Sequence, residues 1–272
     1  MQKAKAMMTA LPTASQIFNL DEKKGSVNPG ANSLFTLGRR GKRAFHTVTG
    51  ERDLFQASIL DTACADGRVG VIPPMVVHAG GTEETMPAHY ACGLPSNCLV
   101  HSNASGYMDK DGVKAYMLSF KQNCGVSLTY PVFLFLDGHE SHFDAEAHRY
   151  LNTNNINTIL IRANNSTNDQ PLDMGPNSHF DSIYKEEGIN WRDLRPNVPL
   201  TIQYYNSIFA TTWQRFVNDP RTAEIVKSAF ARAKLFPVLE DISSLLKGTT
   251  PQEIEEMLYD VVRSCQVKVH HR

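Results

Sequence analysis

The sequence predicts an α/β fold in which a mixed β-sheet is flanked by helices and followed by a helical C-terminal tail. An unbroken apolar run at residues 131–136 is typical of a strand buried inside a sheet. A helical segment at 143–152 and a second apolar run at 157–162 follow it, which predicts a strand–helix–strand unit with parallel strands. An Asp-Gly pair at Asp66 and Gly67, between two β-rich segments, is a strong hairpin signal and adds antiparallel strands.

The remaining elements follow from local patterns along the chain. We expect further strands at residues 16–21, 53–63 and 69–77. A helix that opens at 105–109 is predicted from apolar residues at helical spacing, namely Val113, Tyr116, Met117 and Phe120. Later helices are predicted from Asp173 to Lys185 and at 201–217, 223–233 and 251–265, with irregular segments at 25–41, 80–97 and 188–199.

Composition excludes several classes of protein. Charged residues make up 20% of the 272 residues and hydrophobic residues 42%, as in ordinary globular proteins. No apolar run approaches the roughly 20 residues that span a bilayer, so no membrane segment is expected. The net charge of -1 does not by itself indicate a nucleic-acid partner. The five cysteines are odd in number and have no CxxC spacing, which indicates reduced thiols of an intracellular protein.

Three aspartates each stand just beyond an apolar segment: Asp21, Asp137 and Asp173. The strand–helix–strand unit brings the last two to one edge of the sheet, where open α/β sheets usually hold ligands. Carboxylate oxygens suit hard divalent cations, and two Mg²⁺ ions could clamp the attacking and leaving oxygens of a phosphodiester. Any one of these aspartates alone would be read as a cap or turn residue, so the hypothesis depends on all three together.

Four cationic residues occupy five positions at the end of the irregular segment 25–41 and just after it: Arg39, Arg40, Lys42 and Arg43. This cluster is equally compatible with a solvated loop and with a surface that contacts DNA phosphates beside the site. The aromatic residues Tyr204, Tyr205, Phe209 and Phe216 are at helical spacing, and we interpret them as core residues rather than a base-stacking platform.

Several short motifs occur in one particular order. They are Asn19-Leu-Asp21-Glu22, the Asp-Gly hairpin, Ile72-Pro-Pro-Met-Val76, Ser105-Gly-Tyr-Met108, Phe133-Leu-Phe-Leu-Asp137 with Ser141-His142, Asn165-Ser-Thr167, Gln170-Pro-Leu-Asp173 and Ala229-Phe-Ala-Arg-Ala-Lys-Leu-Phe-Pro237. This ordered set resembles the DDE superfamily endonuclease domain of pogo, Tigger, Jerky and centromere-protein-B-type transposases. The resemblance covers residues 17–238.

The resemblance implies an RNase H-like fold over residues 1–240, with 241–272 as a helical C-terminal extension. It also implies a catalytic and metal-binding triad of Asp21, Asp137 and Asp173, which would use two Mg²⁺ or Mn²⁺ ions to cut and join DNA strands. DNA is then the expected partner, with a possible homodimer, and the nucleus is the expected location.

The sequence departs from the family pattern at several positions. Lys23 stands where the family usually has Thr, Gly138-His-Glu140 where it carries an Asn and a Pro, and Arg162-Ala-Asn164 where it has two prolines. The 20 residues before Asp21 are too few for the helix-turn-helix DNA-binding domain that the family has upstream. The alternative hypothesis is therefore a domesticated, non-catalytic nucleic-acid-binding protein that retains the fold.

Overall fold

The computed structural model describes residues 12–25, 57–80, 88–137, 145–161, 170–195 and 201–236. Within these ranges lies a six-stranded sheet of order β4-β3-β2-β1-β5-β6. The strands are β1 (Ile17–Gly25), β2 (Ala57–Cys64), β3 (Met75–Ala79), β4 (Leu99–Asn103), β5 (Val132–Asp137) and β6 (Ile156–Ile161). β2 runs antiparallel to both neighbours, whereas the pairs β1–β5, β5–β6 and β3–β4 are parallel. This arrangement confirms the expected RNase H-like mixed sheet.

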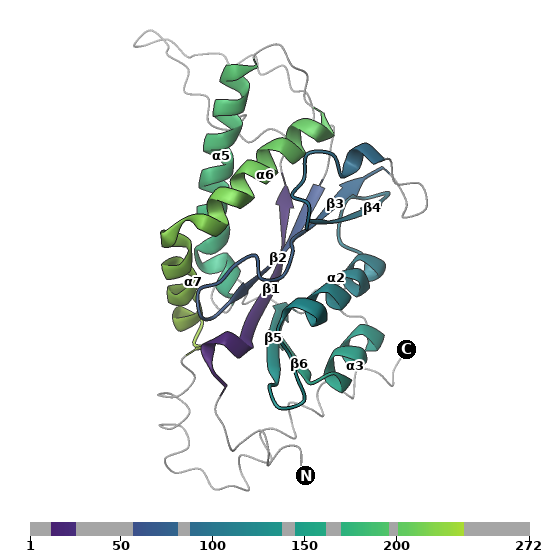
Figure 1. Cartoon of the computed structure of the whole chain (residues 1–272), viewed down its shortest axis with the longest axis vertical. Coiled ribbons are helices and arrows are strands. Elements are labelled where there is room, and N and C mark those ends of the chain that lie inside the picture. Colours follow the sequence, from purple (N-terminus) through teal and green to yellow (C-terminus); the bar gives the residue numbers. More distant parts are fainter. Residues whose placement is uncertain are drawn as a thin grey trace, which may run out of the picture.

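Helices cover both faces of the sheet (Figure 1). One face packs against α5 (Pro176–Leu194), α6 (Ile202–Asn218) and α7 (Pro220–Arg232), and the other against α2 (Lys110–Asn123) and α3 (Ala145–Thr153). Short 3-10 helices lie at η1 (Ala14–Gln16), η3 (Ala88–Tyr90) and η5 (Pro171–Met174). Each face has its own core, because successive strand residues point to opposite sides: Ile17 lies under α5–α7 and Phe18 under α2 and α3.

The first strand is longer than the sequence predicts. We expected it to end at Asp21, but pairing with β2 continues from Phe18↔Cys64 to Gly25↔Ala57. Asp21 is therefore inside the strand rather than just beyond it. The polar residues 22–25 were predicted to begin a loop, but they remain in the strand because β2 pairs with them.

The predicted hairpin is correct in direction but wrong in length. Residue 69 forms only an isolated bridge, Ala63↔Val69, and β3 begins at Met75 instead of at 69. The prolines at 73 and 74 explain the delay, because proline has no N–H to donate to a ladder. The segment predicted to be an irregular loop is followed by β4, a strand that the sequence analysis did not identify.

Among the helices, α2 has the predicted apolar face, and Asp109 caps it by accepting a hydrogen bond from the Gly112 N–H. Helix α5 reaches Leu194, although residues 188–199 were predicted to be irregular. The break at Asp219 is confirmed, since Asp219 is the N-cap of α7 and a proline follows it. The four aromatic residues of α6 are buried core residues as predicted: Tyr204, Tyr205, Phe209 and Phe216.

Some expectations concern residues outside the described ranges. These are the cationic cluster at 39–43, the helix at 251–265, the extension at 241–272 and the motifs at 138–142 and 162–167. In the part of the chain that the structure describes, no helix is both long enough and apolar enough to cross a membrane.

Candidate active site

Three polar side chains of β1 stand at every second position: Asn19, Asp21 and Lys23. They share one face of the strand with Ile17, which lies in the core under α5–α7. Glu22, between them, points to the other face, where its Oε1 accepts a hydrogen bond from the Met108 N–H at 3.1 Å. The Asp-Glu pair of the sequence motif is thus divided between the two faces of the sheet.

The structure brings Asp21 and Asp173 together through one amide group. The Asn177 side-chain nitrogen donates to Asp21 Oδ2 at 2.9 Å and to Asp173 Oδ1 at 3.2 Å. Asp21 is 7% exposed and its Oδ1 accepts the Glu22 N–H, whereas Asp173 is exposed. One carboxylate therefore comes from the sheet and the other from the segment above it. The sequence analysis did not identify Asn177.

Asn19 links the short helix η5 to the sheet through hydrogen bonds. Its side chain is fully buried, with its Oδ1 accepting the Leu172 N–H at 2.9 Å and its Nδ2 donating to the Phe135 carbonyl at 3.1 Å. A single side chain of β1 thus connects β5 on one side with η5, which carries Asp173, on the other.

Gly175 joins η5 to α5 with a backbone φ of 142°, a conformation that residues with a Cβ rarely adopt. A Cβ at this position would also lie 3.1 Å from Ile225 Cγ2 on α7. The turn lets α5 begin at Pro176, so that Asn177 in its first turn faces both carboxylates.

Asp137 is the last residue of β5, at the register position that corresponds to Asp21 on the neighbouring parallel strand. The β1–β5 ladder pairs Ile17 with Phe133 and Asn19 with Phe135. The ladder ends there, and Asp21 and Asp137 each follow two residues later on their strands. The two predicted acids thus follow the paired segment at equivalent positions of neighbouring parallel strands, while the Asp137 side chain is outside what the structure describes.

Asp61 is a fourth acid that the sequence analysis missed. It is the direct cross-strand partner of Asp21, on β2, and it is only 5% exposed. Burial raises the pKa of its carboxyl group to about 7, although the Thr62 N–H and the Lys23 charge act in the opposite direction. The signal in the sequence was a lone acid within a β-rich segment. The structure buries all eight residues of that strand, β2, including Asp61.

Lys23 brings a positive charge to the same face. Its ammonium group donates to the Asn177 carbonyl at 3.4 Å, forms an ion pair with Asp181, and lies 4.0 Å from the centre of the Phe180 ring. Burial lowers the pKa of this ammonium group, and the charges of Asp181, Asp61 and Asp21 oppose that shift.

The donor chemistry of this region fits a hard divalent cation. The Asp21 and Asp173 carboxylates converge on one electropositive amide nitrogen, and oxygen ligands of this kind are those that Mg²⁺ prefers. Among the described side chains, no group of three or more His, Cys, Asp or Glu residues is gathered closely enough to hold a metal ion. A third carboxylate would have to come from Asp137, the last residue of β5.

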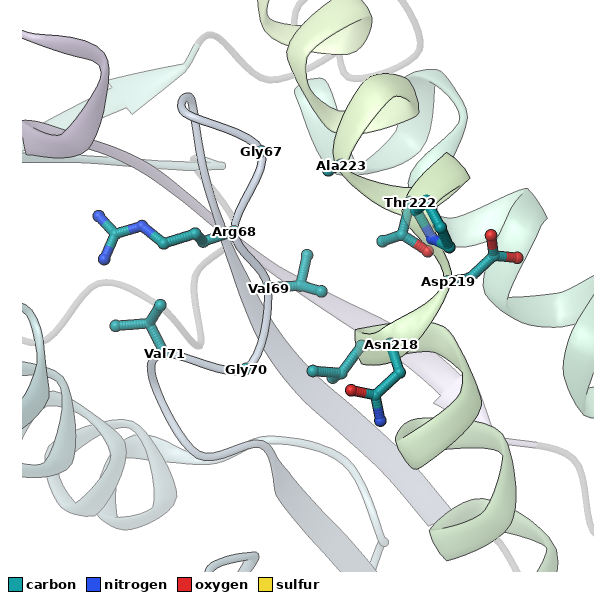
Figure 2. Close-up of a pocket in the computed structure, with 11 residues that line it drawn as sticks. Gly67, Arg68, Val69, Gly70, Val71, Asn218, Asp219, Thr222 and Ala223 are labelled. Atoms are coloured by element: carbon teal, nitrogen blue, oxygen red, sulfur yellow. The ribbon is translucent and has the colours of Figure 1, made fainter.

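A pocket of about 390 Å³ lies elsewhere, between the turn after β2 and the junction of α6 and α7 (Figure 2). Arg68, Val69 and Asn218 are among the side chains that line it. The turn is anchored at the start of β1, where the Ala65 N–H bonds to the Ile17 carbonyl. Asp21 lies four residues further along β1, so this pocket is separate from the carboxylate site.

The fold and the site together define an RNase H-like domain with carboxylates on neighbouring strands and on the segment above them. A sequence model described as DDE superfamily endonuclease matches residues 57–202, more than half of the 272-residue chain. The chain belongs to this family. Asp137 and Asp173 lie within the matched region, and Asp21 lies before it.

A search of curated proteins found no match. The chain is similar to solved structures of a mariner transposase. One is a "Mos1 transposase paired-end complex with left transposon end", with a TM-score of 0.44 and 13% identity over 83% of this chain and 58% of that chain. Another is the "catalytic domain of Mos1 mariner transposase", with a TM-score of 0.37 and 10% identity over 85% of this chain and 87% of that chain. The chain thus spans 58% of the length of the transposase in the paired-end complex.

Proposed function

We propose that this chain is a transposon-derived DDE-type endonuclease domain that cleaves and joins DNA strands with the help of divalent cations. The observation that carries the proposal is the convergence of Asp21 and Asp173 on Asn177, in a chain that belongs to the DDE superfamily endonuclease family. The parallel β1–β5 register, which pairs Asn19 with Phe135 two residues before Asp21 and Asp137, supports Asp137 as a third ligand.

In this proposal the catalytic and metal-binding residues are Asp21, Asp137 and Asp173. When bound, two Mg²⁺ or Mn²⁺ ions would supply charge neutralisation at the attacking and leaving oxygens of the phosphodiester. The protein's part is positioning: the sheet holds Asp21, Asn19 holds η5 above it, and Asn177 orients both carboxylates. Phosphoryl transfer asks mainly for such positioning and for charge neutralisation.

DNA is the proposed partner, and the nucleus the proposed location, because the substrate of a transposon-derived domain is chromosomal. Arg39, Arg40, Lys42 and Arg43 are proposed to contact DNA phosphates, and a second copy of the chain is a possible partner. Replacing these four residues by Ala should reduce the salt dependence of DNA binding, because each lost phosphate contact lowers the slope by about one unit. An unchanged slope would remove the cluster from the interface.

The deciding experiment is cleavage of labelled DNA by the purified chain in Mg²⁺ or Mn²⁺. Asp21→Asn, Asp137→Ala and Asp173→Ala should each abolish cleavage while the circular dichroism spectrum stays unchanged. Asp193→Asn is the matched control, because Asp193 is an exposed aspartate at the far end of α5.

Asp173→Ala is the most informative single variant, since Asp173 is exposed and its removal should leave the core intact. Wild-type chain that binds DNA but neither cleaves it nor binds Mn²⁺ would favour the non-catalytic, domesticated protein. Cleavage that survives in all three variants would contradict the assigned site.

A further inference from the structure

We propose that Lys23 is a built-in counter-ion of the carboxylate site, and that its ammonium group weakens the binding of divalent cations there. The inference rests on the function proposed above and adds a residue that sets the metal affinity of the same site. It starts from the position of Lys23, whose largely buried side chain shares one face of β1 with Asp21.

The sheet register concentrates negative charge beside Lys23. Asp21 and Asp61 are directly opposite each other on β1 and β2. A cation beside two such carboxyl groups favours their ionised forms, because it offsets the repulsion between them. Lys23 lies two residues beyond Asp21 on the same face, which makes it the diagonal neighbour of Asp61, within reach of a long side chain.

The Lys23 charge cannot leave this region easily. Its side chain is 12% exposed, although the Asp181 side chain to which it is ion-paired is 66% exposed. The Asn177 carbonyl accepts a hydrogen bond from the same ammonium group, and Phe180 lies beside it. The side-chain amide of Asn177 also bridges Asp21 and Asp173, so one residue binds both the ammonium group and the two carboxylates.

The positive charge of the Lys23 ammonium group opposes the binding of a divalent cation to the nearby carboxylates. Charges interact more strongly in a partly buried site than in water, because the effective dielectric constant is lower. Every divalent cation that binds Asp21 must therefore approach against the field of Lys23. A neutral residue at position 23 would lack this opposition and leave more negative charge available to the metal ion.

A purely structural role for Lys23 predicts the opposite result. If Lys23 served only to hold the start of α5 against β1, its loss would misplace Asn177 and weaken cation binding. The sign of the change in Mn²⁺ affinity therefore separates the two possibilities.

The experiment is a titration of Mn²⁺ into the full chain without DNA, followed by electron paramagnetic resonance of the free ion. Lys23→Met should lower the Kd for Mn²⁺ about tenfold, an effect of the size expected for one unit charge removed from a partly buried site. Lys23→Arg keeps the charge and should bind like the parent chain. Lys227→Met is the matched control, because Lys227 pairs with Glu224 on the exposed side of α7.

Lys23→Gln provides a second neutral variant that can still donate to the Asn177 carbonyl, should Lys23→Met fail to fold. An equal or higher Kd in the folded neutral variant, or a lower Kd in Lys23→Arg as well, would overturn the proposal. Mn²⁺ binding by neither the parent nor the neutral variants would overturn it together with the proposed metal site. An unchanged Kd beside Mn²⁺-dependent cleavage would overturn the role of Lys23 alone.

Discussion

The carboxylates of Asp21 and Asp173 accept hydrogen bonds from the same amide nitrogen, although one lies on the first strand and the other on a 3-10 helix that follows the last strand. The nitrogen belongs to Asn177, at 2.9 Å from Asp21 Oδ2 and 3.2 Å from Asp173 Oδ1. Two like charges are held close because one donor lies between them. The side chain of Asn177 therefore orients both carboxylates toward one point.

Asn177→Ala should reduce DNA cleavage about 10- to 100-fold, which is the usual cost of removing a group that orients metal ligands. Without the shared donor, the two carboxylates repel each other and lose their common orientation. The free energy of unfolding should fall by only about 1 kcal/mol, because the two hydrogen bonds that Asn177 donates are partly exposed to water. Single-turnover cleavage and thermal melting of the same preparation measure both quantities.

Asn218→Ala is the control for that variant. It removes an exposed amide that donates to the Gln214 carbonyl on α6, far along the chain from the site. Cleavage by the control should equal that of the parent. Equal losses in both variants would show that Asn177 has no special role.

Asn19→Leu should destabilise the fold by about 2–4 kcal/mol, because it leaves two buried backbone groups without their partner. These groups are the Leu172 N–H and the Phe135 carbonyl. Leu has the γ-branched shape of Asn but is larger, so no cavity forms and the loss reports the missing hydrogen bonds together with crowding by the two methyl groups. Urea denaturation followed by tryptophan fluorescence gives the free energy.

Asn123→Leu is the comparison variant, since the Asn123 amide bonds to the Ser119 carbonyl at the exposed end of α2. Its cost should stay below about 1 kcal/mol. A similar, small cost for Asn19→Leu would mean that water replaces the lost partner.

Asp61→Asn should change how stability depends on pH. The carboxyl has an ordinary pKa of 3.8, and burial raises it to about 7 in the folded chain. The folded state therefore binds the proton more tightly than the unfolded state, and stability is lost as pH rises from about 4 to about 7. Asn cannot ionise, so the variant should gain on the order of 2–4 kcal/mol relative to the parent across that window.

The measurement is urea denaturation of both proteins between pH 3 and pH 8 with a chelator present. Below pH 4 the difference between them should be constant, because Asp61 is protonated in both states there. A difference that stays constant up to pH 8 would contradict a raised pKa for Asp61.

Gly175→Ala should cost roughly 1–3 kcal/mol of stability, because a Cβ is strained at a φ of 142°. It should also displace η5, because the new Cβ would lie 3.1 Å from Ile225 Cγ2, and cleavage should fall as Asp173 moves. Gly125→Ala is the matched control: its φ is also positive, at 75°, but no atom lies within 4 Å of the added Cβ. Cleavage unaffected by Gly175→Ala would show that the turn does not set the position of Asp173.

Local sequence determined much of the fold. The spacing of apolar residues predicts β5, the helix α3 that follows it and the buried face of α2. This spacing depends only on neighbours along the chain. The break between α6 and α7 is likewise local, since Asp219 caps and the next proline begins the helix. Errors appeared where a partner strand or helix decided the outcome: β1 continues past Asp21 because β2 pairs with it, and α5 continues through Trp191, which packs on Tyr204.

The sequence by itself determined which acids stand beside apolar segments, and it made Asp21, Asp137 and Asp173 the candidates. Only the tertiary structure decided that Asp61 belongs with them, because its neighbour Asp21 is reached across a sheet ladder and not along the chain. The same holds for Asn177 and Lys23, whose roles depend on α5 packing against β1. Spacing along a chain records which face of an element is apolar, whereas the contacts between polar groups of different elements exist only once those elements are packed.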